Sequence, residues 1–186
     1  MEKEEFRRYG HEIVDWIVDY LDTVEDYPVL AQVEPGEVKG RLPESAPEDP
    51  EPMERIWKDF KNDILPGMTH WQHPSFFAYF PANSSEPSLL AEFLTAALGA
   101  QCMVWQTSPA ATELEEVVMA WLRQMLGLPE AWTGVIQDTA STSTLCALLC
   151  ARERATDFMA NDKGLFQGDA QGLTVYTSEE SHSSIE

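Results

Sequence analysis

The chain has 186 residues, 44% of them hydrophobic and 10% aromatic, which is enough for one domain with a core or for a small domain with an appendage. Twelve basic side chains face 32 acidic ones, and the formal charge of −20 argues against a nucleic acid or an anionic membrane as partner, because few cations are present to neutralise phosphates. The three cysteines suggest no disulfide framework, and no apolar run or leader reads as a membrane or secretion signal, so we expect a cytoplasmic protein with buried free thiols.

The first 80 residues read as two amphipathic helices joined by a connector. Apolar side chains recur at helical spacing over residues 4–25 and again over 53–64, where Pro66 and Gly67 end the second helix. Residues 28–52 contain six prolines among many acidic side chains and predict an extended connector. Such helices bury little by themselves, so we expect an arm that wraps over a partner subunit.

Aromatic and imidazole rings crowd the segment from residue 69 to residue 81. Rings of this kind pack into cores or form the flat walls of small-molecule pockets, and both alternatives are open here. His70 and His73 stand three residues apart, but Pro74 favours an extended loop and no acidic or cysteine partner completes a ligand set. We therefore expect no metal site.

Two further helices follow. Ser84 or Ser85 predicts the cap of a helix that ends at Gly99, and Ser108-Pro109 predicts the start of another that ends at Gly127. We expect the apolar side chains of the second of these helices to point inward, beneath a larger domain. They are Leu114, Val117, Val118, Trp121, Leu122 and Met125.

The stretch from residue 134 to residue 145 predicts a short buried strand, a turn of small hydroxylated residues and the start of a helix. The unpaired N–H groups and the dipole at a helix N-terminus favour an anion, and the hydroxyls of Thr139, Ser141 and Thr142 would add donors, while Ala140 allows close approach. An ordinary capped helix explains the same residues. The glycines of a Walker loop or a dinucleotide fingerprint are missing.

A glycine-rich loop at residues 163–172 and a second predicted strand at 173–177 follow that helix. A strand, a helix and a strand in this order predict a parallel sheet with a crossover helix. Two strands are too few for a closed α/β core, so we expect the chain to be the front part of a longer protein.

Seven motifs occur together, in order and with matching spacing, over nearly the whole chain. They are Phe6-Arg7-Arg8, Val33 to Gly36, Pro66 to Trp71, His73 to Pro81, Ser108 to Glu115, Gly134 to Leu145 and Ser181 to Ser184. In these motifs the chain resembles the N-terminal part of the pyridoxal-phosphate-dependent group II decarboxylases, most closely the aromatic-L-amino-acid decarboxylases.

The resemblance implies an α/β protein: the N-terminal part of a fold type I pyridoxal-phosphate enzyme, with a helical arm followed by the start of a mostly parallel sheet flanked by helices. It implies a helical arm and dimerisation segment at residues 1–80 and the first part of the cofactor-binding domain at 81–186. The implied cofactor is pyridoxal 5'-phosphate, the implied reaction is the decarboxylation of aromatic L-amino acids, and the implied assembly is a homodimer that interlocks through the arm.

The resemblance also implies roles for single residues. Thr139, Ala140 and Ser141 match the positions that hold the cofactor phosphate. His182 matches the imidazole that stacks on the pyridine ring near the reacting carboxylate. The implied walls of the aromatic substrate pocket are Trp71, Tyr79, Phe80, Pro81 and Met103, with Trp105 beside them.

Two departures from the family pattern limit these expectations. The family's Schiff-base lysine and the aspartate on the pyridine nitrogen fall beyond the last residue, so the remainder is expected on another chain or to have been truncated. A non-catalytic dimerisation module or an inactive fragment is the alternative. Asp138 stands where many relatives carry glycine, and we expect its carboxylate to face away from the phosphate, bonded to backbone.

Overall fold

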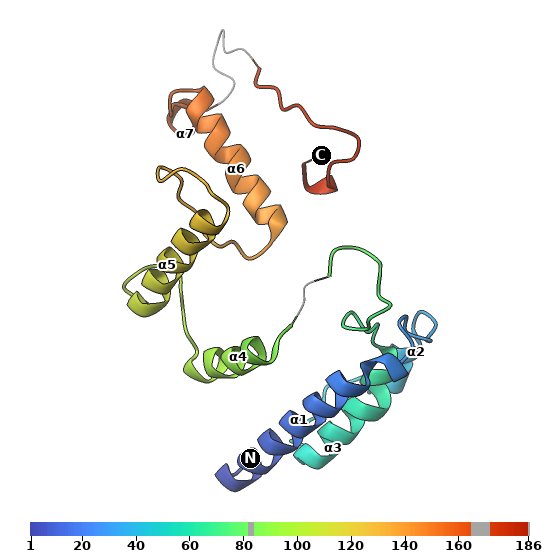
Figure 1. Cartoon of the computed structure of the whole chain (residues 1–186). Helices are drawn as coiled ribbons and strands as arrows, with labels where there is room; N and C mark the ends of the chain where they lie inside the picture. The colour runs from blue at the N-terminus through green and yellow to red at the C-terminus, as the bar shows by residue number, and fades with distance from the viewer. Residues whose placement is uncertain (82–83, 165–171, 186) are drawn as a thin grey trace. The chain divides into compact units, whose positions relative to one another are not determined.

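The computed structural model describes residues 1–81, 84–164 and 172–185, and every regular element within these ranges is helical (Figure 1). The chain divides into two compact units, Met1–Ala97 and Leu98–Glu186. No helix in the described ranges is long and apolar enough to span a bilayer. The domain boundary expected after residue 80 stays a prediction.

The first unit is built on helix α1 (Lys3–Thr23), which continues into a 3₁₀ turn, η1 (Val24–Asp26). Helix α3 (Met53–Asp59) continues as a π-helical turn, η2 (Phe60–Ile64), and a 3₁₀ turn, η3 (Leu65–Gly67). The two amphipathic helices predicted for the arm are therefore confirmed, and Pro66 and Gly67 lie in the turn that ends the second.

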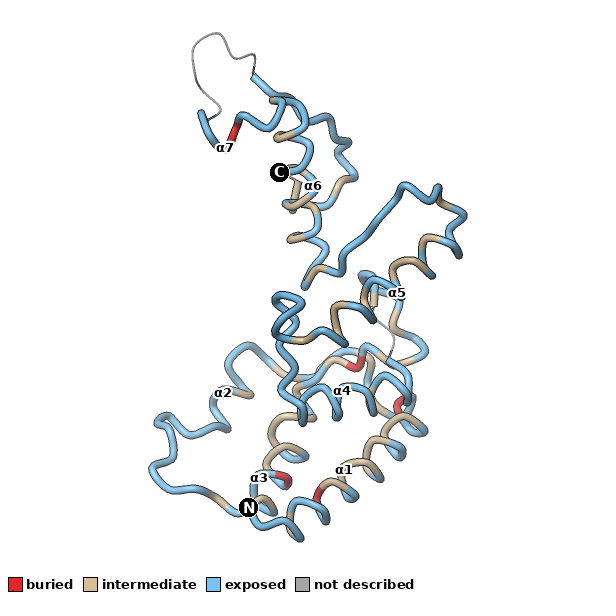
Figure 2. The backbone as a smooth tube through the Cα atoms, turned by 90° about the vertical axis from the view of Figure 1, so that its left-hand side faces the viewer, coloured by how far each residue is buried: buried red, intermediate tan, exposed pale blue. Residues whose placement is uncertain are grey.

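Aromatic rings join α1 to α3. Trp16 meets Trp57 and Phe60 edge-on, with ring centroids 5.5 and 5.4 Å apart, and Trp57 stacks on Phe60. Trp57 is buried and its indole N–H donates to Glu12 Oε1 at 2.8 Å. Among the described residues of this unit, Tyr9, Val24 and His70 are also buried, and Figure 2 colours the backbone red at buried residues.

The proline content predicted a fully extended connector over residues 28–52, but part of the connector is helical. Residues Glu37–Arg41 form a short helix, α2, after Gly36, whose φ of 93° needs a residue without a side chain. Glu37 accepts from the backbone N–H of Glu34 and pairs with Arg41, and these hydrogen bonds lower the pKa of Glu37. A short helix therefore forms between Pro35 and Pro43, where these hydrogen bonds stabilise it.

Helix α4 (Glu86–Leu98) begins directly after Ser85, one of the two residues predicted to cap it. The backbone N–H of Ser85 donates to Ser88 Oγ at 3.0 Å, and the N–H of Ser88 donates back to Ser85 Oγ at 3.4 Å. This reciprocal pair has the pattern of a capping box, with serine in place of the usual glutamate. Gly99 ends the helix with a φ of 58°.

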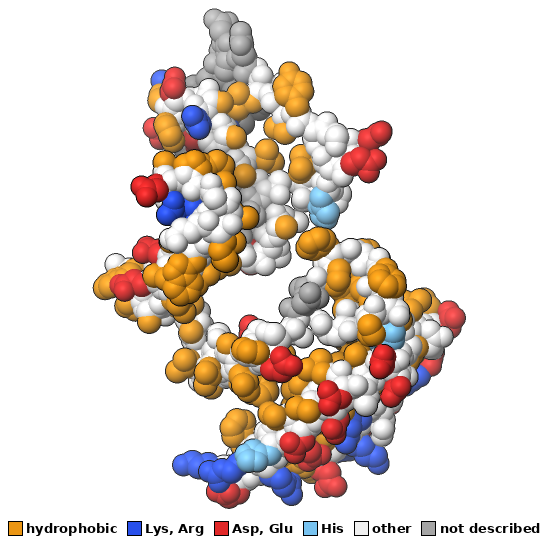
Figure 3. Space-filling view, in the orientation of Figure 1, with side chains coloured by type: hydrophobic (Ala, Val, Ile, Leu, Met, Phe, Trp, Pro, Cys, Tyr) orange, Lys and Arg blue, Asp and Glu red, His pale blue; other side chains and the backbone are white. Residues whose placement is uncertain are grey.

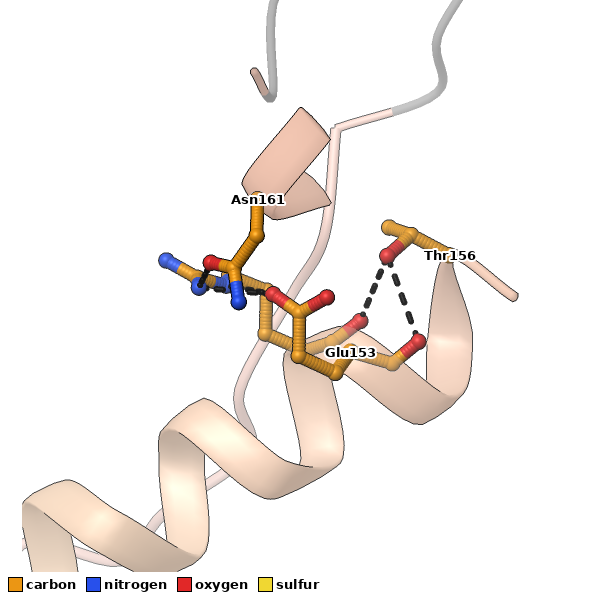
Figure 4. A network of polar contacts seen from close by, with 4 residues as sticks. Glu153, Thr156 and Asn161 are labelled. Atoms are coloured by element: carbon orange, nitrogen blue, oxygen red, sulfur yellow. Dashed lines mark hydrogen bonds and ion pairs between the residues drawn. The ribbon is translucent and has the colours of Figure 1, made fainter. Parts of the chain in front are cut away.

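The second unit contains α5 (Pro109–Met125), α6 (Ala140–Ala155), the short α7 (Ala160–Lys163) and a 3₁₀ turn, η4 (Ser183–Ile185). Proline opens α5 directly after Ser108, and Gly127 follows its end with a φ of 66°, both as predicted. At the far end of α6, Arg152 bridges Glu153 and Asn161 of α7, and the Thr156 hydroxyl donates to two carbonyls of the last turn (Figure 4).

The structure does not confirm the predicted sheet. Neither the segment at 134–137 nor the segment at 173–177 forms a strand, and the described residues contain no β-ladder. A parallel strand is defined by hydrogen bonds to a neighbour, and neither segment has one within these residues. The α/β fold class therefore remains an expectation from the resemblance.

The apolar face of α5 was expected to lie inside, but it is exposed, and so is the apolar face of α4. Trp121 is 56% exposed and Leu114 62%, and Leu94 and Leu98 of α4 are similarly open. Figure 3 shows hydrophobic side chains gathered over these helices, whereas acidic side chains gather over α1 and α3. Cys102 and Cys150 are also exposed and Cys146 is half-buried, so the expectation of buried cysteines is wrong for Cys102 and Cys150. Amphipathic spacing gives the face of a helix but not what covers it.

Candidate functional site

Helix α6 begins at Thr139, which is the N-cap and has an extended backbone. Its hydroxyl accepts from the N–H of Thr142 at 3.1 Å and lies 3.1 Å from the hydroxyl of Thr142. The carbonyl of Thr139 accepts the N–H of Ser143. Two of the three hydroxyls that we expected as phosphate donors are thus engaged in capping the helix.

The remaining donors of this N-terminus are open. The N–H groups of Ala140 and Ser141 belong to the first turn, where a helix offers no acceptor of its own. The Ser141 hydroxyl makes no hydrogen bond among the described residues, and Thr139, Ala140 and Ser141 are all exposed. Two N–H groups, one hydroxyl and the dipole of a 16-residue helix fit the oxygens of a phosphate group. The neighbouring Asp138 is exposed and makes no hydrogen bond within the same residues, so the backbone partner expected for it is not observed.

Helix α5 contacts the segment at residues 134–137, which leads into the start of α6. Glu115 Oε1 accepts from the backbone N–H of Ile136 at 2.7 Å. Gly134 lies against Met119, because a Cβ atom at this position would come within 2.3 Å of the end of that side chain. No local pattern in the sequence pointed to this contact of Glu115 with a residue 21 positions away.

His182 precedes η4, and its ring is exposed. Nδ1 accepts from the backbone N–H of Ser184 at 3.1 Å and lies 3.0 Å from the Ser184 hydroxyl. Because Nδ1 is an acceptor, the proton of the neutral ring is on Nε2. The free edge of the imidazole is therefore a hydrogen-bond donor. Figure 1 shows η4 beside α6, and the two elements are in contact.

The aromatic loop lies in the first unit. Trp71 stacks on Phe76 and on Tyr79, with centroids 4.8 and 5.7 Å apart. Tyr79 has a φ of 57°, a conformation that bulky residues rarely adopt and that often marks functional loops. The side chains of Tyr79 and Phe80 are 87% and 98% exposed, and Pro81 is half-buried. The loop thus presents rings at its surface.

Met103 and Trp105 lie in the second unit, in a loop closed by Thr107. The Thr107 hydroxyl is within hydrogen-bond distance of the carbonyls of Gln101 and Val104. Trp105 donates its indole N–H to Glu113 Oε1 at 3.0 Å, and Met103 is 75% exposed. The side chain of Met103 is therefore free to contact a ligand, as expected of a residue in the wall of a substrate pocket.

Two histidines that looked like weak metal candidates have other roles. His70 is the buried polar side chain among the described residues, and its Nδ1 lies 2.8 Å from the hydroxyl of Tyr20. His73 accepts from the N–H of Ser75 at Nδ1, so its Nε2–H faces the carbonyl of Glu25 at 3.3 Å. No three potential metal ligands cluster in the described ranges.

The structure therefore assembles the predicted site residues in two groups. Thr139, Ala140 and Ser141 open the helix beside which the His182 turn lies, within the second unit. Trp71 and Tyr79 stack together in the first unit, and Phe80 does not join that stack.

Comparisons with known proteins place these features in a family. Residues 35–186 match the model of the pyridoxal-dependent decarboxylase conserved domain. The chain is 46% identical to an aromatic-L-amino-acid decarboxylase of Catharanthus roseus, over 98% of this chain and 36% of that protein. It is 44% identical to a phenylacetaldehyde synthase of Arabidopsis thaliana, over 100% of this chain and 38% of that protein.

A solved structure is similar as well. The crystal structure of Catharanthus roseus tryptophan decarboxylase in complex with L-tryptophan matches 88% of this chain and 35% of that chain, at 49% identity and a TM-score of 0.79. The chain thus spans little more than a third of the length of these relatives.

Proposed function

The chain belongs to the pyridoxal-dependent decarboxylase family, and we propose that it serves as the N-terminal portion of an enzyme that decarboxylates aromatic L-amino acids to amines. The open N-terminus of α6 with the His182 turn beside it is the observation that carries this proposal. Relatives named aromatic-L-amino-acid decarboxylase and tryptophan decarboxylase support the substrate class.

The residues of α6 would hold the cofactor by its phosphate. The N–H groups of Ala140 and Ser141 and the Ser141 hydroxyl would donate to phosphate oxygens, while Thr139 keeps the helix end in place through its bond to Thr142. Bound pyridoxal 5'-phosphate supplies the sink for the electron pair that stays behind when the α-carboxylate leaves.

His182 and the aromatic loop would orient the reacting bond. The imidazole would stack on the pyridine ring, and its Nε2–H, left free by the bonds of Nδ1 to Ser184, would be the donor available to a carboxylate. The rings of Trp71, Tyr79 and Phe80, with Pro81 and Met103, would form the walls against the aromatic side chain of the substrate and exclude water. Shielding from water strengthens each polar contact in the site.

We also propose a cytoplasmic homodimer that interlocks through the arm, with residues 1–80 as arm and 81–186 as the start of the cofactor-binding domain. Exposed apolar side chains on α1, such as Phe6 at 71%, offer contacts to a second copy. The three cysteines are all free thiols, which suits a reducing compartment.

A paired substitution tests the cofactor site. In the full-length enzyme we expect Ser141→Ala to weaken pyridoxal-phosphate binding about tenfold, the value of one hydrogen bond to a charged group. Ser143→Ala, on the same helix but beyond its first turn, should leave affinity unchanged. Affinity is read from the visible absorbance of the cofactor, and equal losses in both variants would contradict the site. His182→Ala should cost turnover at least about a hundredfold with the cofactor retained.

An aldehyde-forming reaction is the second candidate, because the phenylacetaldehyde synthase of Arabidopsis thaliana is almost as similar as the decarboxylases. Mass spectrometry of products from a panel of aromatic amino acids separates the two: amines support the proposal, and aldehydes support the second candidate. The absence of turnover in a cofactor-loaded full-length protein would favour the non-catalytic dimerisation module.

A further inference from the structure

His70 connects the arm to the aromatic loop. Its imidazole is 4% exposed and packs between the rings of Tyr20 and Tyr27, with centroids 5.6 and 4.6 Å away. Tyr20 belongs to α1, 50 residues earlier, and its hydroxyl is 2.8 Å from Nδ1 of His70. The two atoms share one hydrogen, and the tautomer of the imidazole sets which of them is the donor.

The backbone around His70 is fixed to the same part of the arm. The N–H of His70 donates to the carbonyl of Val29 at 3.0 Å, and the Thr69 hydroxyl accepts from the N–H of Ala31 at 3.3 Å. The carbonyl of His70 in turn accepts from the N–H of His73 at 3.0 Å. The start of the aromatic loop is therefore held on both sides of the imidazole.

The position of Trp71 follows from that anchor, and the position of Tyr79 follows from Trp71. Trp71 is the next residue along the chain, and its ring lies nearly parallel to that of Tyr79, with an angle of 11° between the planes. Tyr79 has a backbone with φ of 57°, which an isolated loop would not hold without such a contact. A shift of His70 would displace both rings.

We propose that His70 is a positioning residue for the substrate wall: its imidazole, held by the hydroxyl of Tyr20, sets the placement of Trp71 and Tyr79. The proposal rests on the proposed function, because it takes these rings as the surface that meets the aromatic side chain. Its first consequence is kinetic: weakening the anchor impairs substrate binding more than it impairs the chemical step.

The proposal is tested by substitutions of Tyr20 and His70 in the cofactor-loaded full-length enzyme. Tyr20→Phe should raise KM for an aromatic substrate about fivefold, the usual effect of one hydrogen bond, with kcat changed less than about twofold. Tyr9→Phe is the matched control, since Tyr9 is also a buried tyrosine of α1 but its hydroxyl makes no hydrogen bond among the described residues. His70→Phe should act like Tyr20→Phe, and the double variant should be no worse than either.

A conservative variant and a second readout separate positioning from mere stability. His70→Asn places an amide, which can donate or accept, near the position of Nδ1 and should recover part of the lost affinity. In Tyr20→Phe, amide hydrogen exchange at His73 and Phe76 should accelerate relative to Tyr9→Phe, because their N–H groups bond within the anchored loop.

Each outcome decides the proposal. Unchanged exchange at these amides overturns the anchor whether or not the protein is a decarboxylase. Faster exchange with an unchanged KM overturns the role in the substrate wall. Faster exchange in a protein that turns over no aromatic amino acid contradicts the proposed function instead, and the anchor then remains as a structural contact only.

Discussion

At the scale of single residues, partners that are distant in sequence decide what the side chains do. The spacing of His70 and His73 suggested a weak metal pair, whereas each ring bonds to the arm, at Tyr20 and at the carbonyl of Glu25. The cap at Thr139 was predictable, because a hydroxyl before an apolar helical run is a local signal. No local pattern reports a contact between positions 20 and 70, so the role of His70 required the structure.

The burial of His70 has a consequence for stability at acid pH. Burial first, and then the neighbouring His73, hold the pKa of His70 below its ordinary 6.5, with Tyr20 and Tyr27 as the other titratable groups that face it. The unfolded chain therefore binds a proton more readily than the folded one, and the contribution of this residue is present above about pH 6.5 and lost as pH falls through the lower, folded pKa.

We expect the wild-type chain to lose more stability than His70→Asn between pH 7.5 and pH 5.5, because the variant lacks the titrating ring. Urea unfolding at both pH values measures the change in the free energy of unfolding of each protein. Both proteins have the same carboxylates, so their contribution to that change cancels in the comparison. A wild-type chain with the smaller loss would contradict the sign of the shift.

At the scale of elements, the helices could be predicted from the sequence and the strands could not. The starts of α4 and α5 follow from Ser85 and from Ser108-Pro109, and their ends follow from Gly99 and Gly127. The backbone hydrogen bonds of a helix lie within the helix itself, so the hydrophobic period and the capping residues are enough to predict it. A strand depends on a neighbour, and the segments at 134–137 and 173–177 have no paired neighbour in the described ranges.

The cap of α6 should be measurable by itself. Thr139→Ala removes the acceptor for the N–H of Thr142 and should lower the free energy of unfolding by about 1 kcal/mol. Thr144→Ala is the matched control on the same helix: the Thr144 hydroxyl bonds back to the carbonyl of Ala140, and alanine is the better helix former, so no loss is expected. Chemical denaturation followed by circular dichroism compares the two, and equal losses would show that Thr139 is not the cap.

The contact between α5 and the turn segment predicts an effect at a distance. Glu115→Ala removes the acceptor for the N–H of Ile136 and should weaken cofactor binding severalfold in the full-length enzyme, because the segment before Thr139 loses its tie to α5. Glu116→Ala removes the adjacent charge, which makes no hydrogen bond within the described residues, and should have no such effect. If both variants bind the cofactor equally well, Glu115 does not position the turn.

At the scale of the whole molecule, the dominant feature is a large accessible surface on which many apolar side chains are exposed. The chain exposes 15845 Å², whereas two separate compact proteins of about half its mass would together expose about 11,000 Å². The sequence indicated which faces are apolar, and it also implied that something covers them. It predicted that the apolar residues of α5 lie inside, because helical spacing shows which face is apolar but not what packs against it.

This area predicts that stability depends on protein concentration. If a second copy covers part of the apolar surface, a hundredfold increase in concentration should add about 2.7 kcal/mol to the apparent free energy of unfolding. Thermal unfolding at several concentrations, with sedimentation to count copies, provides the check. A midpoint that does not move with concentration would contradict the homodimer.

The central claim is that the N-terminus of α6 binds a phosphate beside His182. A crystal structure of the full-length enzyme with pyridoxal 5'-phosphate tests it most directly. We predict phosphate oxygens within about 3 Å of the N–H groups of Ala140 and Ser141 and of the Ser141 hydroxyl, with the imidazole of His182 stacked on the pyridine ring. A phosphate bound to other residues, or an imidazole turned away from the ring, would contradict the account.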